Sequence, residues 1–118
     1  MKKQLNLGEL IFLLSRIAPE SEVRYDFARF TPEGLDSYRG YYDQLALGYG
    51  EKEITVAELL KICKDMVGAT RQGYKGGDFQ MGESTPVWMA QWGDCYDTAI
   101  VGVIDTGYQA ILETAYVG

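Results

Sequence analysis

One stretch decides the fold of this chain: AIVGVI at residues 99–104, in which no side chain is polar. A strand that is buried on both faces reads as a continuous apolar run, whereas a half-buried strand alternates. We therefore predict that residues 98–104 form a central strand of an antiparallel sheet. DTG at residues 105–107 then predicts a hairpin turn, and residues 108–117 return as the neighbouring strand.

Further strands are predicted at residues 22–30, 35–49, 76–81 and 85–92. In the first of these segments Val23 and Tyr25 alternate with Arg24, which is the period of a strand with one buried face. Proline and glycine within residues 31–34 predict a tight turn before the second segment, which reads as one or two strands. The predicted sheet therefore draws on both halves of the chain.

The first helix is predicted over about residues 6–18. Asn6 and Glu9 have the spacing of a capping box, and apolar residues follow at helical intervals. Phe12 and Leu13 fall outside that stripe, so apolar side chains cover more than one side of the helix. Two explanations stay open: the helix contacts a second chain as well as its own core, or it is deeply buried in one core.

The second helix is predicted over about residues 55–67. Thr55 and Glu58 form a capping box, and Gly68 is typical of a C-terminal stop. Together these patterns predict a single compact domain of the α+β class over residues 1–118, with two helices and an antiparallel sheet. A chain of this length can bury one core but not two independent ones.

The composition limits both the class of protein and its partners. Hydrophobic residues make up 47% and charged residues 24% of the chain, which is the balance of a globular protein. The longest apolar run is far below the roughly 20 residues that cross a bilayer, so we expect no membrane span and no targeting segment. A formal net charge of -6 argues against a polymeric nucleic acid as partner, although a local basic pocket could hold a small anion.

Residues that usually carry catalysis or bind metals are scarce. The chain has no histidine, which is the commonest metal ligand and the commonest general base at neutral pH. Cys63 and Cys95 have neither zinc-type nor disulfide spacing. Asp94 with Asp97 reads more simply as part of a turn than as an acid and a base. We therefore expect a protein that is not an enzyme, with no catalytic residue, no metal site and no cofactor.

Three segments could instead bind a small ligand. The first is GYKGGDF at residues 73–79, where glycine N–H groups, a cation and two rings come together: Tyr74, Lys75, Gly76, Gly77 and Phe79. Such a loop can hold a phosphate and stack a base. It lacks the Walker-type spacing and the helix that would follow it, and a plain hairpin turn is the alternative.

The second segment is SYRGYYD at residues 37–43. Tyr38 offers a stacking face with a hydroxyl, and Arg39 offers a fork of donors that suits phosphate oxygens. In the alternative, the tyrosines pack in the core and Arg39 pairs with Asp36 or Asp43.

The third segment is TPVWMAQW at residues 85–92, where a strand would place Trp88 and Trp92 on one face. Ala90 lies between them and leaves a gap that could receive a flat ring, although core packing of both tryptophans is the alternative. Arg24 is a further candidate, because it lies on the polar face of its strand, where a pocket wall would use it.

Taken together, these segments resemble the first family of Thoeris anti-defence proteins of bacteriophages and prophages. The similar stretches are SYRGYY (37–42), LAL (45–47), TVAELL (55–60), GYKGGDF (73–79), TPVW (85–88) and AIVGV (99–103). The resemblance covers about residues 37–103. It implies tight sequestration, without hydrolysis, of cyclic ADP-ribose isomers that bacterial TIR-domain proteins make during infection.

The resemblance also implies where and in what form the protein acts. It implies the cytoplasm of the infected bacterial host, and a homo-oligomer, at least a dimer, with pockets that involve more than one chain. Some relatives are similar in having a second site for cyclic oligonucleotides.

The implied ligand carries a pyrophosphate, two riboses and an adenine, so it needs cations or N–H groups, hydroxyl partners and a stacking surface. The residues that we assign to these roles are Arg39, Lys75, Gly76 and Gly77 for the phosphates, Phe79 and Trp88 for the base, and Tyr38, Tyr74 and Arg24 for the sugars or the pocket wall.

Two other functions compete with this one. An interaction module would bind a protein through the first helix and the aromatic strands. A hydrolase would open a cyclic nucleotide with Asp94 or Asp97 and a bound metal, and it would show turnover that chelation abolishes.

Overall fold

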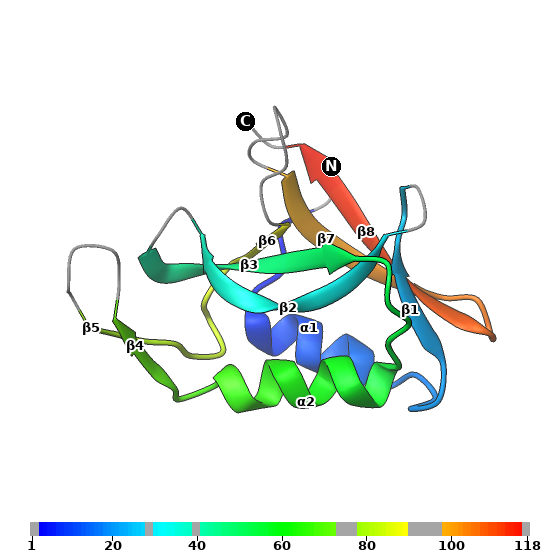
Figure 1. The fold of residues 1–118 in the computed structure, drawn as a ribbon, viewed down its shortest axis with the longest axis horizontal. Helices are drawn as coiled ribbons and strands as arrows, with labels where there is room; N and C mark the ends of the chain where they lie inside the picture. The colour runs from blue at the N-terminus through cyan, green and yellow to red at the C-terminus, as the bar shows by residue number, and fades with distance from the viewer. Residues whose placement is uncertain (1–2, 28–29, 39–40, 73–77, 90–97, 117–118) are drawn as a thin grey trace.

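The described part of the chain forms two helices and eight strands, and both helices lie on one side of a curved sheet (Figure 1). The computed structural model describes residues 3–27, 30–38, 41–72, 78–89 and 98–116. The elements are β1 (Glu22–Tyr25), β2 (Thr31–Tyr38), β3 (Tyr41–Gly50), β4 (Thr70–Gln72), β5 (Asp78–Gln80), β6 (Val87–Met89), β7 (Thr98–Asp105), β8 (Gln109–Tyr116), α1 (Leu7–Leu14) and α2 (Val56–Met66). The predicted α+β class is confirmed, and the fold is a compact single domain.

The main sheet has the strand order β1-β8-β7-β6-β3-β2, and β4 pairs with β5 in a separate ribbon. β7 carries the apolar run and is internal to the sheet, as predicted. The prediction of a wholly antiparallel sheet is wrong, because β1 runs parallel to β8 and β3 runs parallel to β6. Parallel partners need a long connection rather than a hairpin. Both pairs join strands that are far apart in the chain, so no local turn signal reports their direction.

The N-terminal segment is inserted into the sheet, which the sequence did not predict. The Leu5 N–H donates to the Ile100 carbonyl at 2.8 Å, and the Leu5 carbonyl accepts from the Val87 N–H at 3.1 Å. Leu5 therefore lies between β6 and β7, which pair with each other at Trp88 and Ala99. This insertion fixes the start of α1 against the sheet.

The sheet curls until its two outermost strands meet, and the buried Tyr25 fixes that curl. The Tyr25 N–H donates to the Phe30 carbonyl at 3.0 Å, just before β2 begins. The Tyr25 hydroxyl donates into β3, where the Leu47 and Gly48 carbonyls lie at 2.9 and 2.6 Å. Burial raises the pKa of the Tyr25 phenol far above its usual range, so the donor stays protonated. Figure 1 shows β2 curving towards β1.

Both helices begin as predicted. The capping box of Asn6 and Glu9 is present at α1, and that of Thr55 and Glu58 at α2. Gly68 follows α2 with φ of 79°, a conformation that only glycine adopts without cost. The buried faces of the two helices supply much of the core: Leu7, Leu10, Leu14, Val56, Leu59, Cys63 and Met66. No helix within the described ranges is long and apolar enough to cross a membrane.

Two predictions about the first half of the chain are wrong. α1 ends at Leu14, four residues before the predicted end, and Phe12 is 59% exposed, which excludes deep burial of the whole helix within one chain. Residues 31–34 are not a turn but the start of β2, with an irregular register between Pro32 and Leu35. Proline is tolerated there because β2 is an outer strand of the sheet.

The predicted turn at residues 105–107 is confirmed. Gly107 has φ of 93°, and its N–H donates to Asp105 Oδ1 at 2.9 Å. The Thr106 N–H donates to the Gln109 carbonyl at 3.0 Å, which closes the hairpin between β7 and β8.

Replacing Tyr25 with phenylalanine tests the constraint that curls the sheet. Tyr25→Phe keeps the ring and removes the donor to the two β3 carbonyls, so we expect the free energy of unfolding to fall by about 1–3 kcal/mol. Urea denaturation measures it. Tyr108→Phe is the control, because Tyr108 is 86% exposed and its replacement should change stability by less than about 0.5 kcal/mol. Equal stability of Tyr25→Phe and the unaltered protein would contradict the role of this hydroxyl.

Candidate functional site

A row of three alanines and one tryptophan crosses the face of the sheet opposite to the helices, and two of its alanines, Ala46 and Ala99, are buried. The register places Ala46 of β3 beside Trp88 of β6, Trp88 beside Ala99 of β7, and Ala99 beside Ala115 of β8. The neighbours of Trp88 along β6 are buried in the helix-covered core, and Trp88 alternates with them. We call these four residues the Trp88 row. Trp88 is its one large side chain and is only partly buried.

The Trp88 ring is held in a defined orientation. Its indole N–H donates a hydrogen bond to Gln44 Oε1. Gln44 lies two residues before Ala46 on β3, so both side chains belong to the same face of the sheet. This bond uses the only donor of the indole.

Most of the sequence-predicted site residues lie outside the described residues: Arg39, Tyr74, Lys75, Gly76 and Gly77, together with Ala90, Trp92, Asp94, Cys95 and Asp97. For two others the structure gives a backbone position. Tyr38 ends β2 opposite Tyr41, and Phe79 lies in β5 opposite Arg71. The sequence prediction for these residues stays a prediction.

Arg24 and Trp88 share a face of the sheet but not one location. Arg24 pairs in register with Ile111 of β8, whereas the Trp88 row reaches β8 at Ala115. The two side chains are offset along the strands and also lie three strands apart in the strand order. Together these offsets separate them by roughly 20 Å along the sheet. The Arg24 guanidinium donates to Gln109 Oε1 at 3.3 Å and to the carbonyl of its neighbour Tyr25 at 3.2 Å. Within one chain, Arg24 therefore does not line the same small pocket as Trp88.

The hollow beside Arg24 has the wrong charge for a phosphate. It measures about 260 Å³, and its walls include Glu22, Glu51 and Glu53. These carboxylates would repel an anion at the distances of a pocket wall. Arg24 is better explained by its bonds within the sheet than by the role in sugar binding that the resemblance implies.

The N-terminal N–H groups of both helices already have acceptors in the chain. At α1 the bonds run from Leu7 to the Thr85 carbonyl, from Gly8 to the Glu83 carbonyl and from Glu9 to Asn6 Oδ1. At α2 they run from Val56 to the Ser21 carbonyl, from Ala57 to the Pro19 carbonyl and from Glu58 to Thr55 Oγ1. A helix N-terminus binds a phosphate through such groups. Neither helix therefore presents an anion site, so a pyrophosphate would need cationic side chains or a loop.

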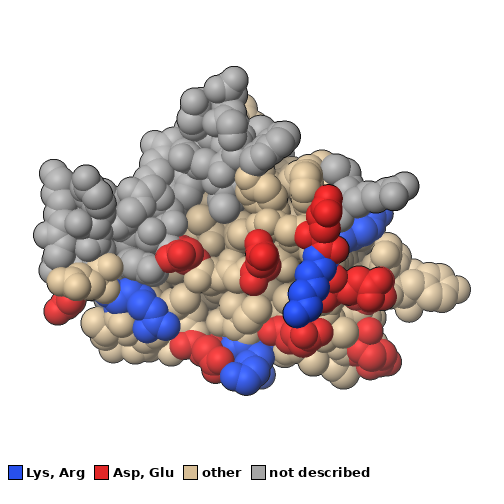
Figure 2. Space-filling view, viewed as in Figure 1, with Lys and Arg blue, Asp and Glu red and all other residues tan. Residues whose placement is uncertain are grey.

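Charged side chains are mixed over the face that carries α2. Figure 2 shows Asp and Glu spread across it with Lys and Arg between them. A field of mixed sign gives no broad attraction for an anion. Recognition of a phosphate would therefore depend on individual cations close to the ligand.

Among the described residues, the candidates for nucleophilic or metal chemistry are few. No group of three or more His, Cys, Asp or Glu side chains in this part of the chain is arranged to hold a metal ion. Cys63 is fully buried in α2, and burial raises the pKa of its thiol to about 12. A buried thiol with so little thiolate is a packing residue rather than a nucleophile.

Sequence reasoning named Trp88 but missed the residues that surround it. Ala46, Ala99, Ala115 and Gln44 come from three other strands, and only the register brings them together. The sequence pattern that could have indicated this arrangement is Leu-Ala-Leu at residues 45–47, where a small residue lies between two buried leucines. Comparison with models of known protein families, with curated proteins and with solved structures found no match to this chain.

The reactivity of Cys63 tests its burial. The variant Cys95→Ser leaves Cys63 as the one thiol that can react with an aromatic disulfide reagent. We expect this reaction to be at least about 100-fold slower in the folded chain than in urea. Folding lowers the fraction of thiolate and also blocks the access of the reagent to the sulfur. The absorbance of the released thiol measures the rate. Rapid labelling of folded protein would contradict the packing role.

Proposed function

We propose that this protein binds a small nucleotide without cleaving it. The ligands that we propose are cyclic ADP-ribose isomers made by TIR-domain immune enzymes, which a phage protein would sequester in the cytoplasm of the infected bacterium. The resemblance over about residues 37–103 supports the class of ligand, and the Trp88 row supports the way in which a base would be held. We also propose that the working form is a homo-oligomer. A second site for cyclic oligonucleotides belongs to some members of the family that this chain resembles.

The observation that carries the proposal is the setting of Trp88. Its direct cross-strand partners are small: Ala46 of β3 on one side and Ala99 of β7 on the other. Stacking of a base on an aromatic ring is worth about 1–3 kcal/mol. An adenine stacked on this indole would add that interaction without rearranging the strands beneath it.

We propose two cations for the phosphates, Arg39 and Lys75, and the chain limits how far Arg39 can lie from the strand next to the Trp88 row. Asp36 of β2 pairs with Ala46 and so lies next to the row. Arg39 follows three residues later, which limits the separation of its Cα from that of Asp36 to about 11 Å. Lys75, Gly76 and Gly77 connect β4 with β5. We propose Arg39 and this glycine-rich segment as the partners of the pyrophosphate.

Sequestration without turnover is the proposed mode of action. A ligand that is held by stacking and by charge needs no general base or nucleophile, and the described thiol, that of Cys63, is buried and protonated. The energy of binding would then appear wholly as affinity rather than as stabilisation of a transition state.

A protein-binding module is the second candidate function. Phe12 on α1, Ile104 in β7 and Tyr108 at the hairpin are 59%, 45% and 86% exposed, and exposed aromatic and aliphatic side chains are typical of interfaces. This function would use α1 or the hairpin rather than the Trp88 row.

Calorimetry with cyclic ADP-ribose isomers tests the proposal. We expect Trp88→Ala to weaken binding by about 5-fold to 150-fold, because it removes the stacking surface. Lys75→Ala should also weaken binding, and more strongly at low salt, because it removes a charge. Tyr108→Ala is the control at an exposed aromatic position far from the row in the fold, and it should bind like the unaltered protein.

Chromatography of the ligand released by heat separates the three functions. Intact ligand is expected for sequestration. A hydrolysed product would contradict it in favour of an enzyme, and the absence of binding to every isomer would favour the protein-binding module.

A further inference from the structure

One acid of β8 lies on the same face of the sheet as Trp88. Glu113 pairs in register with Gly102 of β7, and Ala115 of the Trp88 row lies two residues further along the same strand. Leu112, the residue before Glu113, is buried in the helix-covered core. Because side chains alternate along a strand, Glu113 belongs to the opposite face, which carries the Trp88 row.

The Glu113 side chain extends over the neighbouring strand. A Cβ built on Gly102 would lie 2.4 Å from Glu113 Oε1 and 3.3 Å from its Cδ, so the carboxylate lies directly over the glycine. β7 is the strand between β8 and β6. The carboxylate is therefore displaced from its own strand towards the strand of Trp88, and any side chain at position 102 would take its space.

The register places this carboxylate near the ring of Trp88. Gly102 lies on the strand next to β6, which is about 4.8 Å away. Glu113 is two residues from Ala115, which is about 7 Å along the strand. Together these offsets separate the carboxylate from the Cα of Trp88 by roughly 8 Å in the plane of the sheet. The ribose of a nucleotide is bonded directly to its base, so one nucleotide can reach both side chains.

We propose that Glu113 binds the hydroxyls of the ribose whose base stacks on Trp88. The inference rests on the proposed function and adds a second contact to the same nucleotide. A carboxylate accepts hydrogen bonds through two oxygens with about four lone-pair sites, so it can bind ribose hydroxyls and keep its bonds within the chain. Hydrogen bonds to an ionised acceptor are roughly twice as strong as those between neutral groups.

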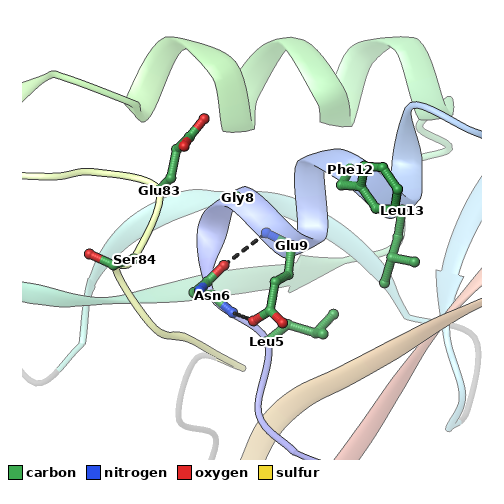
Figure 3. Close-up of a pocket in the computed structure, with 8 residues that line it drawn as sticks. All are labelled: Leu5, Asn6, Gly8, Glu9, Phe12, Leu13, Glu83 and Ser84. Atoms are coloured by element: carbon green, nitrogen blue, oxygen red, sulfur yellow. Dashed lines mark hydrogen bonds between the residues drawn. The ribbon is translucent and has the colours of Figure 1, made fainter.

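A groove beside α1 supplies a matched control acid. It has a volume of about 630 Å³, and Figure 3 shows Glu83 at the opposite end of its lining from Phe12. α1 packs against the helix-covered face of the sheet, whereas Trp88 lies on the other face. Glu83 is exposed and lies out of reach of a nucleotide that stacks on Trp88.

Calorimetry with two ligands tests the proposal. They are the cyclic ADP-ribose isomer that the unaltered protein binds most tightly and its analogue without the free hydroxyls of the adenosine ribose. For the unaltered protein, removal of the hydroxyls should raise the dissociation constant about tenfold to 100-fold, because bonds to a charged acceptor are lost. In Glu113→Ala the two ligands should bind within about twofold of each other, since the acceptor is gone.

Gly102→Ala tests whether the position of the carboxylate matters. The new Cβ would displace Oε1, which is the flexible end of the Glu113 side chain, while the charge of the protein stays the same. We expect the difference in affinity between the two ligands to shrink at least about threefold. Urea denaturation checks that each variant is folded.

The remaining outcomes separate this inference from the proposed function. Glu83→Ala should bind both ligands like the unaltered protein. If the unaltered protein binds no isomer, the proposed function and this inference both fail. If it binds but Glu113→Ala keeps the full dependence on the hydroxyls, this inference alone is overturned. The same holds if that dependence is lost instead in Asp36→Asn, which alters the acid beside the row on β2.

Discussion

The hydroxyl of Tyr25 is the interaction on which the rest of the fold depends. It lies in the core and donates from β1 to the carbonyls of β3, while the Tyr25 N–H donates to the carbonyl of Phe30, just before β2. Its ring begins a chain of aromatic contacts through Phe27 and Phe30 to Tyr49, with centroids 5.3, 5.9 and 5.4 Å apart. A buried hydroxyl must find an acceptor, and here the acceptors are available only if the sheet curls. One polar requirement therefore sets the shape of an otherwise apolar core.

This curl separates the two faces of the sheet by chemistry. The enclosed face receives the leucines of α1 and α2, and the N-terminal donors of both helices are used to fix the helices to neighbouring loops. The open face keeps Trp88, Gln44 and a run of alanines. Most of the buried apolar side chains therefore lie on the enclosed face, and the ligand site that we propose lies on the other.

The proposed homo-oligomer would also change how binding is organised. Arg24 and Trp88 lie roughly 20 Å apart in one chain, so a nucleotide-sized ligand would reach both only if residues from two chains met at one pocket. The acidic surroundings of Arg24 argue against even that role. Arg39 and Lys75 therefore stay the cations that we propose for the phosphates.

The sequence by itself determined the local structure: two capping boxes, the glycine stop after α2, the hairpin at residues 105–107 and the internal place of the apolar strand. Each depends on residues a few positions apart, where caps, turns and periodicity act directly. Only the tertiary structure decided the parallel pairings, the insertion of Leu5 and the curl around Tyr25. It also decided that alanines from three other strands surround Trp88, while the ligand itself rests on resemblance and proposal. The parallel pairings and the bonds of Leu5 join residues far apart in the chain, and strand register across such separations is chosen by burial and hydrogen bonding of the whole core rather than by any local pattern.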